Sequence, residues 1–137
     1  MKMRIHGNSI RLRLSRSEVE ELEQSGRVGD KISFGPNPND SVTYGLEADP
    51  SARSVFAHRS PDSITIFVPK DKASEWTSSE LVGFEGNQDI GNGDSLSILV
   101  EKDFQCLQAR EGEDESGNFP NPLAEAGGHP ECSATDD

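Results

Sequence analysis

A strand-like segment that leads directly into a capped helix is the strongest structural signal in this sequence. In SIRLRL, residues 9–14, apolar and polar residues alternate, and the side chains of a strand point to opposite faces with a period of two. The next segment has Ser15 at the N-cap position and Glu18 three residues later, which is a capping-box pattern, and Gly26 provides a left-handed stop. We therefore expect a half-buried strand followed by a helix of about ten residues.

Further strand-like segments follow, and turn-forming residues separate them. They are KISFG, SVTYGLEA, RSVFAH, SITIFVP, LVGFEG and DSLSILVEKDFQCLQ. Consecutive strands of this kind favour an antiparallel meander, and residues 71–77 are expected to form a short helix around Trp76. The expected fold class is α+β, with a mainly antiparallel sheet that curls toward a barrel, one clear helix and one short helix. No repeat is visible at a fixed spacing.

The length and hydropathy of the chain limit it to one domain with a modest core. It has 137 residues, of which 31% are hydrophobic, and a mean hydropathy of −0.68. We expect a single domain over residues 1–122 and an acidic, disordered tail over 123–137. No apolar run resembles a signal sequence or a membrane span, so we expect a cytoplasmic protein.

Charge is distributed unevenly along the chain. Residues 1–16 contain five basic residues and no acidic one, whereas residues 101–137 contain ten acidic residues against Lys102 and Arg110. The formal net charge of −12 argues against nucleic-acid binding, which requires a concentrated positive surface. We expect the two oppositely charged regions to contact each other within one compact domain.

Several motifs resemble those of an uncharacterised family of short bacterial proteins. RIHGNSIRLRLSRSEVEEL, VGFEG, LVEKDFQCL and FPNP match its pattern K-I-R-I-x-G-N-S, R-x-R-L, E-K-D-F-x-C-L and P-N-P over nearly all of residues 1–122. Only the tail after Pro122 departs from the pattern. The resemblance does not imply a specific activity. One alternative function that it implies is that of a maturation factor for a redox enzyme.

Basic residues of the first strands form a candidate anion-binding site. Arg4, Arg11 and Arg13, assisted by Lys102, are predicted to hold a small anion, because guanidinium groups bind carboxylates and phosphates in a bidentate manner. The structural alternative is that these arginines pair with acidic residues of EKDF or EGEDE. The sequence alone leaves both readings open.

The two cysteines allow a candidate metal site. Cys132 and His129 are close in sequence, and Cys106 is a possible third ligand for a soft metal. The alternative is that the tail residues are adventitious and that Cys106 is a buried, inert thiol.

These observations favour a small cytosolic binding or accessory module over an enzyme. We expect no cofactor, no nucleic acid and no membrane as a partner, and either another protein or a small anion as the ligand. The alternatives are an anion-binding protein or enzyme that uses the arginines, and a metal carrier.

Overall fold

The computed structural model describes residues 1–104. Met1–Asp103 form one compact unit, and Phe104 is the first residue of a second unit, Phe104–Asp137. The domain boundary expected at residue 122 and the tail expected at 123–137 lie outside the described residues. No helix of the described part is long and apolar enough to cross a membrane.

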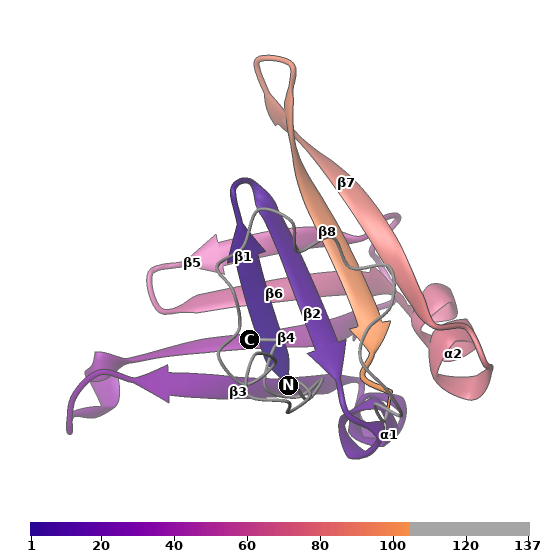
Figure 1. Cartoon of the computed structure of the whole chain (residues 1–137), viewed down its shortest axis with the longest axis horizontal. Helices are drawn as coiled ribbons and strands as arrows, with labels where there is room; N and C mark the ends of the chain where they lie inside the picture. The colour runs from indigo at the N-terminus through magenta and orange to yellow at the C-terminus, as the bar shows by residue number, and fades with distance from the viewer. Residues whose placement is uncertain (105–137) are drawn as a thin grey trace, which may run out of the picture. The chain divides into compact units, whose positions relative to one another are not determined.

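The unit Met1–Asp103 is built from short strands, two α-helices and one 3-10 turn (Figure 1). In chain order they are β1 (Lys2–His6), β2 (Ser9–Leu14), α1 (Arg16–Ser25), β3 (Arg27–Ser33), η1 (Pro38–Asp40), β4 (Ser41–Asp49), β5 (Phe56–Ser60), β6 (Ser63–Pro69), α2 (Lys70–Ser78), β7 (Gly83–Gly91) and β8 (Asp94–Lys102).

The strands form two separate four-stranded sheets. Sheet A has the order β1-β2-β8-β7, and sheet B has the order β3-β4-β6-β5. In each sheet the outer pairs are antiparallel, whereas the central pair, β2–β8 or β4–β6, is parallel. The α+β class is confirmed. The expected single antiparallel meander that curls toward a barrel is wrong, because each sheet is mixed and neither closes.

The two halves of the unit repeat the same topology. Each half consists of a hairpin, a helix and a second hairpin, and the second hairpin joins the opposite sheet. A shift of 54 residues relates the pair Lys2–Arg13 of β1–β2 to the pair Phe56–Phe67 of β5–β6. The same shift relates the two parallel pairings. The pairing of β2 with β8 begins at Ser9, and the pairing of β6 with β4 begins at Ser63. The unit Met1–Asp103 is therefore a structural duplication, although no repeat is visible in its sequence.

Equivalent positions of the two halves supply the core between the sheets. The strands of sheet A cross those of sheet B in Figure 1, and one apolar cluster packs between them. Buried pairs related by the shift of 54 residues are Leu12 and Ile66, Leu14 and Val68, Val19 and Ala73, Leu22 and Trp76, and Leu46 and Val100. The pairs are apolar, but none is identical, which explains why the duplication escapes sequence comparison.

The capped helix predicted from the sequence is present. Ser15 is the N-cap of α1, and it forms the full capping box with Glu18. Gly26 ends the helix with a left-handed φ of 83°, which glycine adopts without steric cost. The second helix, expected at 71–77, spans Lys70–Ser78 and buries Trp76, whose indole donates a hydrogen bond to the Val82 carbonyl at 3.1 Å.

A side chain fastens the edge of sheet B to sheet A. Gln88 of β7 accepts a hydrogen bond from the Ala57 N–H at 2.7 Å and donates one to the Ala57 carbonyl at 3.2 Å. The side-chain amide thus pairs with both backbone polar groups of one residue on β5, as a neighbouring strand would. Next to it, Gly86 lets β7 approach Val55, whose Cβ would lie 2.8 Å from a Cβ at position 86.

Replacing Gly86 with alanine is expected to separate β7 from Val55 and to lower the free energy of unfolding by about 1–3 kcal/mol, the usual cost of overpacking. Urea denaturation measures the change. Glu85→Ala is the matched control, since Glu85 is an exposed neighbour on the same strand. Equal stabilities of the Gly86→Ala and control variants would contradict the close packing of β5 and β7.

Candidate functional site

The outward face of sheet A gathers the charged residues of both ends of the described chain. Because side chains alternate along a strand, the residues that flank the buried positions of β2 and β8 point away from the core. We call this surface the charged face. It carries Lys2, Arg4, Arg11, Arg13, Glu101 and Asp103.

Two arginines converge on one carboxylate oxygen. The Nε atom of Arg11 donates a hydrogen bond to Oε1 of Glu101 at 2.7 Å, and the Nε atom of Arg13 lies 3.7 Å from the same oxygen. Beside them, Lys2 Nζ lies 3.7 Å from Asp103 Oδ2. The parallel pairing of β2 with β8 brings these residues together, since it places Arg13 opposite Glu101.

The central carboxylate offsets an unfavourable arrangement of like charges. Arg4 and Arg11 are direct cross-strand partners in β1–β2, and like charges in such positions repel each other. The side chains of Arg11, Arg13 and Glu101 are 34%, 10% and 22% exposed, so water screens their interaction only in part. The expected contact between the basic N-terminal segment and the acids of EKDF is therefore present.

Lys102 does not join the arginines. It is the neighbour of Glu101 on β8 and points to the opposite side of the sheet. Its Nζ atom donates a hydrogen bond to the Ser79 carbonyl at 2.7 Å and lies 5.7 Å from the centre of the Trp76 ring. The predicted set thus separates into three arginines on the charged face and one lysine at the end of α2.

The predicted metal ligands Cys106, His129 and Cys132 lie outside the described residues, so this site stays a prediction. Within residues 1–104, no group of three histidine or acidic side chains is arranged to hold a metal ion.

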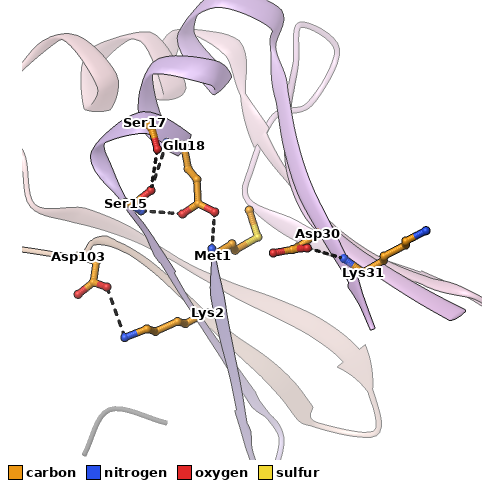
Figure 2. A network of polar contacts seen from close by, with 8 residues as sticks. All are labelled: Met1, Lys2, Ser15, Ser17, Glu18, Asp30, Lys31 and Asp103. Carbon is orange, nitrogen blue, oxygen red and sulfur yellow. Dashed lines mark hydrogen bonds and ion pairs between the residues drawn. The ribbon is translucent and has the colours of Figure 1, made fainter. Parts of the chain in front are cut away.

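The capping-box pattern accounts for Glu18 only as part of the helix cap, but its carboxylate has a second partner (Figure 2). Oε1 accepts a hydrogen bond from the Ser15 N–H at 2.7 Å, and Oε2 accepts one from the Met1 ammonium group. Partial burial by itself raises the pKa of Glu18. The hydrogen bonds from the ammonium group and from Ser15 outweigh this effect, so the pKa lies below its ordinary value.

A groove lies on the outward face of sheet B, where no motif of the sequence predicts a site. It has a volume of about 450 Å³ and lies over β3, β4 and β6. Its sequence signal is the pair Gly29 and Gly45, which face each other because β3 and β4 pair in this register.

The fold and the charged face define a two-sheet α+β protein with an internal structural duplication. The chain belongs to a family of unknown function, DUF7009, whose family model matches residues 1–123. Neither a curated protein nor a solved structure matches it. Family membership thus confirms the resemblance of the sequence motifs and adds no activity.

Replacing Glu101 with glutamine keeps the shape of the side chain and removes the charge between two guanidinium groups. The free energy of unfolding is expected to fall by about 1–2 kcal/mol, between the values for exposed and for buried ion pairs. Glu85→Gln, on the exposed part of β7, is the control and should change stability little. Chemical denaturation measures both variants, and similar losses would argue against a special role for Glu101.

Glu18 predicts a pH dependence of stability. Because its pKa is lower in the folded chain than in the unfolded chain, the unfolded state binds the proton more tightly. The resulting stabilisation is fully present when the pH is above the pKa that Glu18 has in the unfolded chain. It is lost as the pH falls through the lower pKa that Glu18 has in the folded chain. The stability difference between the wild type and Glu18→Gln should therefore shrink in acid, as thermal denaturation across this range will measure. A difference that stays constant with pH would contradict the ion pair with Met1.

Proposed function

We propose that this protein is a binding or accessory module that recognises an anionic group of a partner through its charged face. The convergence of Arg11 and Arg13 on one oxygen of Glu101 carries the proposal, because it is the arrangement in which two guanidinium groups hold a carboxylate. An acidic group of the partner would then bind the same two guanidinium groups, either beside the Glu101 carboxylate or in its place.

The donor capacity of Arg11 supports this role. A guanidinium group has five N–H donors, and Arg11 uses Nε for Glu101. Its terminal nitrogens make no hydrogen bond within the described residues, and about a third of the side chain is exposed. A carboxylate or phosphate that approaches sheet A can therefore bind Arg11 without breaking the contact with Glu101.

The balance of charge supports an anionic partner. The outward face of sheet A carries the four cations Lys2, Arg4, Arg11 and Arg13 beside the carboxylates Glu85, Glu101 and Asp103. This clustering of basic side chains on one face contrasts with the net charge of −12 for the whole chain. An acidic segment of another protein, rather than a nucleic acid, fits a small cationic area on an otherwise acidic molecule.

Binding of a hexaglutamate peptide to the full chain at low ionic strength tests the proposal. Arg11→Gln is expected to weaken the binding by about tenfold, because a charge-assisted hydrogen bond is lost. Arg16→Gln removes the same charge from a position on α1 where the side chain is 95% exposed, and it should leave the affinity unchanged. Isothermal titration calorimetry measures the affinities, and added salt should reduce them.

Two results would count against this function. One is that hexaglutamate does not bind at low ionic strength. The other is that Arg11→Gln lowers the melting temperature but leaves the affinity intact, in which case the arginines stabilise the fold alone.

A further inference from the structure

The groove on sheet B has a floor of small residues. Gly29 of β3, Gly45 of β4 and Thr65 of β6 form one row across the three strands, on the face opposite the buried row Val28, Leu46 and Ile66. The groove also touches Arg27, Lys31, Thr43 and Glu47. A volume of about 450 Å³ is in the range of small-molecule sites.

The duplicated half shows that this topology does not require a groove here. The equivalent row of sheet A consists of Glu85 of β7, Leu99 of β8 and Arg11 of β2. Larger side chains thus stand at all three positions that form the floor in sheet B. In sheet B, Gly45 additionally allows a close approach of the backbones, since a Cβ there would lie 2.6 Å from the Val28 carbonyl oxygen.

The same comparison reveals a glutamate that makes no ion pair within residues 1–104, although Arg27 lies opposite it on β3. Glu47 is equivalent to Glu101, which binds Arg11, but Thr65 stands at the position equivalent to Arg11. Glu47 is half-buried, and within residues 1–104 its side chain makes no hydrogen bond or ion pair. Because Arg27 is exposed and makes no ion pair with this carboxylate within residues 1–104, Glu47 can bind a positively charged group of a ligand.

The surroundings of Glu47 add an aromatic surface and two cations. Phe67 is its direct neighbour on β6, and it stacks on Phe56 with a distance of 5.0 Å between ring centres. An ammonium group near Glu47 would also be attracted by an aromatic face. On the edge strand β3, the exposed Arg27 and Lys31 line the groove together with Asp30, and the two cations offer partners for an anion.

We infer that this groove binds a small zwitterion of the size of a tripeptide, with its ammonium group at Glu47 and its carboxylate at Lys31. Glu47 is opposite Arg27, and Lys31 follows four residues further along β3. Four residues of a strand span about 13 Å. A tripeptide in extended form spans about 10 Å. The long side chains of Glu47 and Lys31 can reach over the remaining distance to its two charged ends.

The inference is independent of the proposed function, because the groove and the charged face lie on different sheets. Trialanine is the probe, and its two end-blocked forms are chemical controls. Free trialanine is expected to bind the full chain in a saturable manner and to shift the amide NMR signals of Gly29 and Gly45. N-acetyl-trialanine and trialanine amide each lack one charge and should bind about tenfold more weakly.

Substitutions test the assigned positions. Glu47→Gln should weaken trialanine binding about tenfold. Glu75→Gln removes the same charge from an exposed position on α2 and should have no effect. Thr65→Arg introduces an arginine into sheet B at the position equivalent to Arg11 of sheet A. The new arginine should pair with Glu47 and abolish trialanine binding. The circular dichroism spectrum should stay unchanged.

Either of two results would overturn the inference. One is the absence of saturable binding of free trialanine. The other is equal affinity of the free and the end-blocked peptides, or of the wild type and Glu47→Gln. If Thr65→Arg does not fold, the end-blocked peptides and Glu47→Gln still decide the question.

Discussion

The parallel pairing of β2 with β8 is the constraint on which the rest of the molecule depends. It joins Ser9 to Ser97, two residues separated by most of the described chain. Closing a loop of this length costs on the order of 4 kcal/mol in chain entropy, which the pairing and the shared apolar core must offset. Once β2 and β8 are adjacent, the hairpins β1–β2 and β7–β8 form one sheet. The equivalent pairing of β4 with β6 forms the other sheet.

The duplication separates the requirements of the fold from those of the two outward faces. The buried inward positions are apolar in both halves, because both halves contribute to one core. Outward positions contribute less to folding and differ strongly between the halves. Where sheet A has Arg11 and Arg13, sheet B has Thr65 and Phe67, although each sheet keeps a glutamate beside them. Within residues 1–104, the same backbone thus presents a carboxylate paired with arginines in sheet A and a carboxylate without an ion pair in the groove of sheet B.

Electrostatic contacts join segments that the topology brings together. Glu101 neutralises arginines of the first hairpin, and Glu18 links the cap of α1 to the Met1 ammonium group. Gln88 connects the edges of the two sheets through hydrogen bonds. These contacts lie at the margins of the apolar core, where polar groups can be satisfied without full desolvation.

The sequence by itself determined the local elements, because their signals lie within a few residues of each other. Ser15, Glu18 and Gly26 define the ends of α1, and alternation defines β2 and the hairpin β5–β6. The charge asymmetry also predicted a contact between the basic N-terminal segment and acidic residues near the other end, which Arg11 and Arg13 make with Glu101. Tertiary structure alone decided that there are two mixed sheets, since parallel partners distant in sequence leave no local pattern. It also placed Lys102 away from the arginines and Gly29 beside Gly45, because pairing and register decide which distant side chains share a surface.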